Sequence, residues 1–266
     1  MKFFIHTYSN GNTPSKISLC KNDGSLVRIL QENSELKERL KSYNLSKKEF
    51  LKINANGVSL NAWMIKPPNF DPSKKYPVYF NVYGGPGHNE VLDSWDGSDF
   101  MYHQLLAQKG YIVFSVDPRG TMYQGTKFKK STYLELGKLE IEDIINSAKE
   151  LTKLPYVDGN RIGIMGWSYG GFMASLAITK GADIFKMAIA VAPVTNWRYY
   201  DNIYTERFMR TPAENEAGYD GNSPINFVDK MKGKFMEGGQ GNNHPADKLE
   251  KIWTDWEAFA QYAFNK

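Results

Sequence analysis

Residues 166–170, GWSYG, place a serine two positions from a glycine on either side. This G-x-S-x-G spacing is typical of a nucleophile elbow, in which the glycines let a strand and a helix approach closely while the serine adopts a strained backbone. The chemistry that it would support is attack of the Ser168 hydroxyl on a carbonyl carbon. The alternative interpretation is a serine that caps a helix in a glycine-rich turn.

A nucleophile of this kind must stand at the carboxyl edge of a parallel sheet, and the flanking sequence predicts one. Nearly continuous apolar runs are typical of strands buried on both faces, and they occur at residues 76–83, 111–117, 161–166 and 186–192. Helical patterns separate these runs, at residues 99–110, 136–154 and 169–181. The alternation predicts an α/β fold with a doubly wound, mostly parallel sheet, and it places Ser168 between a strand and a helix.

The residues before this region predict other elements. Residues 1–30 alternate short apolar stretches with NG and DG turns, which indicates antiparallel strands. Residues 35–50 have the apolar spacing of a short amphipathic helix. Residues 50–68 predict an antiparallel hairpin that turns at Asn56 and Gly57.

The composition argues against several classes of protein. The chain has 266 residues, 41% of them hydrophobic, and no apolar run near the ~18 residues that a membrane helix needs. Its 33 basic and 29 acidic residues are interspersed, so nucleic-acid binding is not expected. Cys20 is the single cysteine, which leaves no disulfide and no cysteine metal cluster. The N-terminal residues do not have the pattern of a signal peptide.

A tetrahedral intermediate needs donors for its oxyanion. One donor follows from the elbow itself, the backbone N–H of Tyr169 directly after the nucleophile. The other is expected in the loop after an earlier strand, here residues 82–87, VYGGPG, where the Tyr83 hydroxyl is the candidate. The alternative for Tyr83 is a tyrosine that packs in the core at the end of a strand.

Four segments together resemble the dipeptidyl peptidase IV branch of the prolyl oligopeptidase family of serine peptidases: GWSYGGFM, VYGGPG, DPRGTMYQG at 117–125 and APVTNWRYYDNIYTERFM at 192–209. The resemblance covers residues 1–235. It implies an α/β-hydrolase catalytic domain over residues 46–235. Residues 1–45 are then similar to the end of a β-propeller and its connector.

The resemblance also implies roles for individual residues. Ser168 is then the nucleophile, and Tyr83 with the amide of Tyr169 forms the oxyanion hole. The slot for the proline or alanine side chain before the scissile bond is lined by Tyr169, Val194, Trp197, Tyr200 and Tyr204. Flat aromatic walls suit a pyrrolidine ring and exclude bulky branched side chains. The expected substrate is a peptide, and the resemblance implies no cofactor and no metal.

The acid and the base of a Ser-Asp-His triad are not evident in the sequence. In this fold both follow the serine, and His244 is the only histidine after Ser168. The resemblance ends at Phe235, where the next buried strand is expected, so two core strands, the acid and the histidine are predicted to be missing. Residues 236–266 match no part of the family and predict a glycine-rich loop and one helix. His244, which precedes a proline in that loop, is interpreted as an exposed turn residue rather than as a substitute base.

Three functions stay open. The first is a serine peptidase, whose activity in this chain depends on a base that the sequence does not supply. The second is a binding module that keeps the peptide slot without the chemistry, and the third is an esterase, against which the aromatic slot argues. The resemblance implies a periplasmic or cell-surface location, and it leaves open whether the parent protein is a monomer or a homodimer.

Overall fold

The computed structural model of the protein describes residues 2–238, which form two separate sheets. The small antiparallel sheet contains β1 (Phe3–Asn10), β2 (Thr13–Lys21) and β3 (Leu26–Gln31), and α1 (Ser34–Lys41) follows it. The strands of the large sheet are β4 (Lys48–Ala55), β5 (Val58–Ile65), β6 (Tyr76–Asn81), β7 (Ile112–Val116), β8 (Val157–Trp167), β9 (Met187–Val191) and β10 (Lys234–Gly238).

The remaining helices lie between or after these strands. They are α2 (Ser98–Gln108), α3 (Thr126–Lys129), α4 (Lys138–Thr152), α5 (Tyr169–Lys180), α6 (Asn202–Met209) and α7 (Glu216–Asn222), with short 3₁₀ helices at Trp197–Tyr199 and Pro224–Lys230. None of the helices within residues 2–238 combines the length and the apolar composition that crossing a bilayer requires.

The large sheet has the strand order β10-β9-β8-β6-β7-β5-β4. All neighbours from β10 to β7 pair in parallel, whereas the hairpin of β4 and β5 joins β7 antiparallel. The chain passes from β6 to β7 on one side and then to β8 on the other. The loops after β6 and β8 therefore leave the sheet side by side at a switch point, which is where α/β proteins place their ligands.

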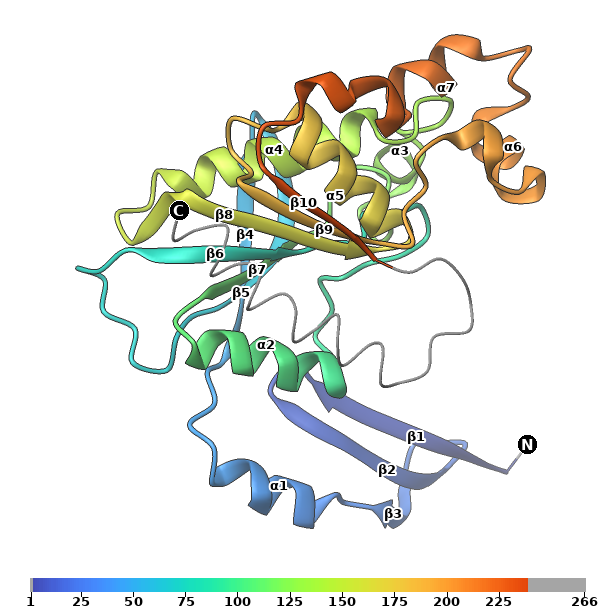
Figure 1. The fold of residues 1–266 in the computed structure, drawn as a ribbon. Helices are drawn as coiled ribbons and strands as arrows, with labels where there is room; N and C mark the ends of the chain where they lie inside the picture. Colours follow the sequence, from blue (N-terminus) through green and yellow to red (C-terminus); the bar gives the residue numbers. More distant parts are fainter. Residues whose placement is uncertain (1, 239–266) are drawn as a thin grey trace.

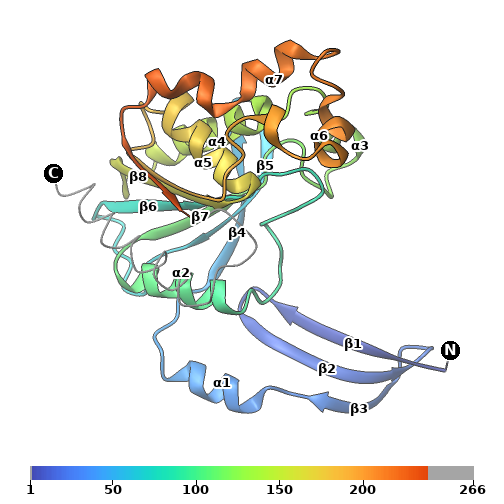
Figure 2. The ribbon, with the colours of Figure 1, turned by 45° about the vertical axis from the view of Figure 1, so that its right-hand side comes forward.

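Helices cover both faces of the large sheet, as the apolar runs predicted. In β6, Val78 and Phe80 belong to the core under α4 and α5, whereas Tyr79 faces the opposite core with Leu106 of α2. Figures 1 and 2 show the same arrangement, with α4 and α5 on one side of the sheet and α2 on the other. Burial of alternate residues on both faces explains why these strands contain almost no polar residue.

One expectation about the helices is wrong. The apolar spacing of residues 35–50 predicted a single helix, but α1 ends at Lys41 and β4 already begins at Lys48. No residue of α1 is buried. A helix that buries no apolar face gains little stability from packing. The residues from Lys48 onward therefore form a strand, in which Lys48 pairs with Ile65 of β5.

The expectation for the strand after β9 is also wrong. The sequence predicted that this strand is missing, because the resemblance ended at Phe235. Instead β10 pairs in parallel with β9, with Lys234 opposite Met187 and Gly238 opposite Val191. The predicted loop and helix of residues 239–266, with His244, lie outside the residues that the structure describes.

Candidate active site

Ser168 lies at the junction of β8 and α5 with φ 57° and ψ −113°. The flanking glycines are required there, because a Cβ on Gly166 would lie 2.3 Å from the carbonyl of Gly170, and one on Gly170 would lie 2.2 Å from the carbonyl oxygen of Val82. The Ser168 side chain makes no capping hydrogen bond to α5. This geometry is that of a nucleophile elbow, and it disfavours the helix-capping interpretation.

Tyr83 stands directly opposite the elbow, in the loop after β6. Its phenol is half-buried and lies near the Ser168 hydroxyl. Burial raises the pKa of Tyr83, the charges of Tyr200 and Glu90 raise it further, and the nearby Ser168 side chain lowers it. The Tyr83 side chain is therefore a neutral donor at physiological pH, placed against the nucleophile.

Tyr169, the first residue of α5, presents two groups to the site. Its backbone N–H has no partner inside the helix, because the first turn of a helix leaves its amides free. Its buried ring lies 6.0 Å from that of Tyr83, centroid to centroid. Gly85 makes this approach possible, since a Cβ there would lie 2.6 Å from the Tyr83 ring and 2.9 Å from the Tyr169 ring.

Glu140 of α4 holds the Tyr169 ring, and the sequence analysis did not identify it. The Tyr169 hydroxyl donates to Glu140 Oε1 over 2.7 Å, and the Gly137 N–H donates to Oε2 over 3.0 Å. Burial raises the pKa of Glu140 to about 8, although both hydrogen bonds lower it. The Gly-x-x-Glu spacing at the start of α4 is the only sequence signal for this contact.

The predicted slot residues come together beside the elbow. The rings of Trp197 and Tyr204 stack at 6.1 Å with an angle of 10°, and the Tyr200 ring is nearly perpendicular to both. The Trp197 ring lies 5.8 Å from that of Tyr169, and Val194 belongs to the same core cluster. Tyr200 is 45% exposed, so the cluster reaches the surface. The arrangement provides flat apolar walls next to Ser168.

His88 and Glu90 lie on the other side of Tyr83, and the sequence analysis assigned neither of them. The His88 ring is 4.5 Å from the Tyr83 ring, and His88 Nε2 is 3.0 Å from Glu90 Oε1. The hydrogen bond with Glu90 raises the pKa of His88, the charges of Glu90 and Asp117 add to this, and burial opposes it. His88 precedes Ser168 in the chain, where this fold does not place the general base of a triad.

The other candidate acids and bases are engaged elsewhere. His103 of α2 is buried against the large sheet, with its ring 5.2 Å from that of Trp63 in β5. Asp201 caps α6, and two further aspartates form ion pairs, Asp183 with Lys232 and Asp220 with Arg198.

A cavity of about 610 Å³ opens next to the slot. Pro86 and Gly87 of the Tyr83 loop form one side, and Phe208, whose ring is 5.0 Å from that of Tyr204, forms another. The remaining lining residues are Lys129, Lys130, Thr132, Tyr133 and Arg207. A peptide with one side chain in the slot would therefore meet basic groups nearby.

Comparison with known proteins points in the same direction. A family model described as "Prolyl oligopeptidase family" matches residues 98–240. The chain is 38% identical over 264 residues to the "Probable dipeptidyl peptidase 4" of Trichophyton verrucosum, an alignment that covers 98% of this chain and 34% of that protein. It is 47% identical over 205 residues to the "Probable dipeptidyl-aminopeptidase B" of Paracoccidioides lutzii, covering 77% of this chain and 22% of that protein.

The fold is also similar to a solved structure. The dipeptidyl peptidase 4 of Porphyromonas gingivalis superposes with a TM-score of 0.86 and 41% identity, covering 98% of this chain and 37% of that chain. The chain thus spans about a third or less of the length of the relatives that it matches.

Proposed function

Since the chain belongs to the prolyl oligopeptidase family, in its dipeptidyl peptidase IV branch, we propose that it carries the acylating part of a serine peptidase. The observation that carries the proposal is the Ser168 elbow, with the Tyr83 phenol near its hydroxyl and the aromatic cluster beside it.

In the proposed reaction Ser168 Oγ attacks the carbonyl carbon of a peptide bond, and its proton passes to a base. The carbonyl oxygen becomes an oxyanion between the Tyr83 hydroxyl and the Tyr169 amide, two donors of the kind that stabilise such intermediates. The C–N bond then breaks, and the amine leaves with the proton. That amine is the shortened peptide. Water then hydrolyses the acyl-Ser168 ester, which releases the amino-terminal fragment as a carboxylic acid and returns the proton to Ser168.

We assign proline and alanine as the residues before the scissile bond. The rings of Trp197, Tyr200 and Tyr204 offer flat apolar faces beside the elbow, which suit a pyrrolidine ring or a methyl group better than a branched side chain. The names of the relatives state that those proteins remove dipeptides. We propose the same activity, at the amino terminus of a peptide, for a protein that spans the full length of these relatives.

The first experiment is labelling of the chain with a fluorophosphonate, read by intact mass, with Ser168→Ala as the control. One adduct on the wild type and none on the variant would support the proposal, because only an activated serine displaces the fluoride. A folded wild type that gains no adduct would contradict acylation by this chain.

A second assay separates the peptidase from the binding module without chemistry. Pyrrolidide and leucine amide analogues of the same dipeptide are compared for binding by calorimetry. Preference for the pyrrolidide together with labelling supports the peptidase. Preference for the pyrrolidide without labelling favours the binding module.

A further inference from the structure

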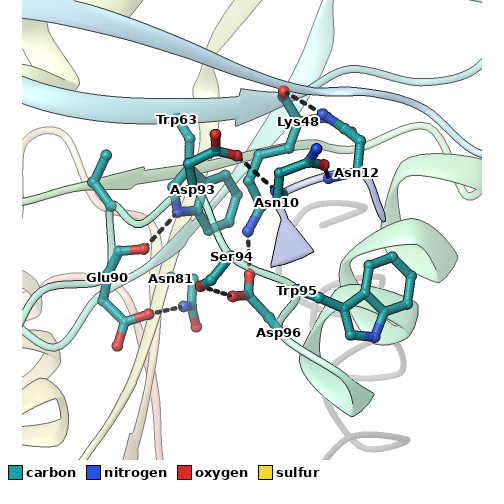
Figure 3. A network of polar contacts seen from close by, with 12 residues as sticks. Asn10, Asn12, Lys48, Trp63, Asn81, Glu90, Asp93, Ser94, Trp95 and Asp96 are labelled. Atoms are coloured by element: carbon teal, nitrogen blue, oxygen red, sulfur yellow. Dashed lines mark hydrogen bonds and ion pairs between the residues drawn. The ribbon is translucent and has the colours of Figure 1, made fainter. Parts of the chain in front are cut away.

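The loop that follows Tyr83 is fixed to the large sheet at its middle. The Asp117 carboxylate, just after β7, accepts hydrogen bonds from the backbone N–H groups of Glu90 and Val91 over 2.8 and 3.1 Å. From β5, the indole N–H of Trp63 donates to the Glu90 carbonyl over 3.0 Å, as Figure 3 shows. The position of this loop is therefore set by contacts far away in the sequence.

The small N-terminal sheet holds the same loop a few residues further on. The Gly11 N–H, in the turn between β1 and β2, donates to Asp93 Oδ1 over 2.7 Å. In return the Trp95 N–H donates to the Ser9 hydroxyl over 3.2 Å. The small sheet thus touches the segment between Tyr83 and α2 directly.

Lys48, the first residue of β4, joins the turn, the loop and the large sheet. Its backbone N–H donates to Asn12 Oδ1 over 2.8 Å, and the Asn12 amide donates to the Lys48 carbonyl over 3.3 Å. Its side chain is fully buried, and Nζ forms an ion pair with Asp96 while lying 4.9 Å from the centre of the Trp63 ring. Figure 3 shows this side chain reaching from β4 to the loop.

From the middle of the loop the contacts continue to the nucleophile. Asn81 donates to Glu90 Oε2 over 3.3 Å, and the other oxygen of Glu90 lies 3.0 Å from His88 Nε2. The His88 ring lies 4.5 Å from the Tyr83 ring, and the Ser168 side chain is close enough to the Tyr83 phenol to lower its pKa. The loop therefore links the N-terminal turn to the residue that faces Ser168.

We propose that Lys48 and the turn of residues 10–12 are positioning elements of the active site. They hold the loop of residues 84–97 and thereby set the place of the Tyr83 phenol against Ser168. The proposal rests on the proposed role of Tyr83 as an oxyanion donor.

The physical reason is the narrow tolerance of an oxyanion hole. A donor acts only when it lies roughly 2.7–3.1 Å from the oxyanion, and a misplacement of ~1 Å costs on the order of a hundredfold in rate. The residue before Tyr83 is tied to the sheet, since the Val82 N–H donates to the Met165 carbonyl over 3.0 Å. His88, whose ring lies against Tyr83, belongs to a loop without regular structure. The buried ammonium of Lys48 and the turn add anchors to that loop.

The test compares Lys48→Met and Asp93→Ala with the control Lys66→Met. Methionine keeps the apolar stem of Lys48, and Asp96 remains 27% exposed, so no buried charge is stranded. Lys66 likewise forms an ion pair at the end of a neighbouring strand, with Glu49, but it does not touch the loop. The readouts are hydrogen exchange of residues 83–97, the rate of fluorophosphonate labelling and the affinity for the pyrrolidide.

We expect Lys48→Met and Asp93→Ala to raise exchange in residues 83–97 and to slow labelling about tenfold or more. Pyrrolidide affinity should change less than twofold, because the slot does not contain Tyr83. Tyr83→Phe should add little to Lys48→Met, since both remove the same donor. The control should match the wild type.

Unchanged exchange in residues 83–97 of Lys48→Met would overturn the proposal, whatever the labelling shows. Fully additive effects of Lys48→Met and Tyr83→Phe would overturn it as well. If Tyr83→Phe alone leaves labelling unchanged, or if the wild type is not labelled, the proposed function fails instead. In that case hydrogen exchange at Tyr83 and His88 alone tests whether Lys48 and the turn hold the loop, and faster exchange in Lys48→Met supports it.

Discussion

The Tyr169 hydroxyl donates to Glu140 Oε1 over 2.7 Å, and both side chains are buried. This one contact fixes the ring of Tyr169, the residue that we propose as the second oxyanion donor and as one wall of the slot. It also places an acid in an environment that favours its neutral form, because burial raises the pKa of Glu140 to about 8. Stability and site geometry are therefore coupled at this pair.

Glu140→Gln should change how stability depends on pH. In the unfolded chain a glutamate loses its proton near pH 4.3, whereas the folded protein keeps it until about pH 8. The folded state binds more protons in that window, so the wild type loses stability as pH rises from about 4.3 to 8. The variant does not titrate. Its melting temperature relative to the wild type should therefore rise across this window and level off above it.

Thermal melts from pH 5 to 9 measure this difference, with Glu150→Gln on the exposed side of the same helix as the control. Parallel curves for Glu140→Gln and the wild type would show that the buried acid does not titrate as proposed.

The elements that the sequence predicted correctly have a purely local signal. Strands such as β6 and β9 are buried on both faces, so each is an apolar run that needs no knowledge of its neighbours. β10 was missed because it contains the polar Lys234 and Glu237, and it pairs with β9 as its only partner within the described residues. Its sequence, KFMEG, therefore lacks that apolar run.

The candidate site divides in the same way. Ser168, Tyr83 and the slot were predicted from a local motif and from the resemblance, and they remain predictions. Glu140 was missed because its partner lies 29 residues away, and only the packing of α4 on α5 brings the two together. Lys48 was missed because a lysine at the start of a strand normally indicates exposure, and only the fold shows that it is buried.

His103→Gln should reduce the loss of stability in acid. Burial, with a smaller contribution from the charge of Lys48, lowers the pKa of His103 to about 3. Between pH 6.5 and about 3 this histidine is protonated in the unfolded chain but not in the folded protein. The free energy of unfolding therefore decreases as the pH falls. The variant should lose some packing at every pH but show a flatter decline. Melts from pH 7 to 4, with the exposed His6→Gln as the control, measure the slope, and an unchanged slope would contradict the prediction.

Gly170→Ala should disrupt the elbow. The new Cβ would lie 2.2 Å from the Val82 carbonyl oxygen, and both atoms belong to backbone that cannot move independently of the sheet. We expect a loss of about 2–3 kcal/mol or more in the free energy of unfolding. Gly221→Ala is the matched control, because nothing lies within 4 Å of its Cβ in α7, and it should gain about 0.5–1 kcal/mol. Urea denaturation measures the free energy of unfolding of both variants, and equal values would refute the steric argument.

Arg119→Lys should be strongly destabilising although it preserves the charge. The Arg119 guanidinium donates to both oxygens of Asp143 at 2.7–3.0 Å, and Asp143 is fully buried. Lysine cannot reproduce that bidentate geometry, so about 2 kcal/mol should be lost. Arg161→Lys, which faces the partly exposed Asp158, should lose less than about 1 kcal/mol. Urea denaturation measures the free energy of unfolding of both variants. Similar losses would show that the bidentate contact of Arg119 stabilises the fold no more than the exposed ion pair of Arg161 does.

Tyr204→Leu should reduce the preference for proline more than it reduces stability. The Tyr204 ring is half-buried and stacks on Trp197 at 6.1 Å, so a leucine in its place removes one flat wall of the slot. Loss of that wall should weaken binding of the dipeptide pyrrolidide about tenfold, in line with the 1–3 kcal/mol that such pocket contacts contribute. The leucine amide analogue, which the wild type is expected to bind more weakly, should bind no worse or slightly better. Tyr199→Leu is the control, because Tyr199 is 86% exposed and should leave both affinities unchanged. Calorimetry with the two ligands measures the selectivity, and an equal loss for both ligands in Tyr204→Leu would mean that these rings support the fold without selecting the substrate.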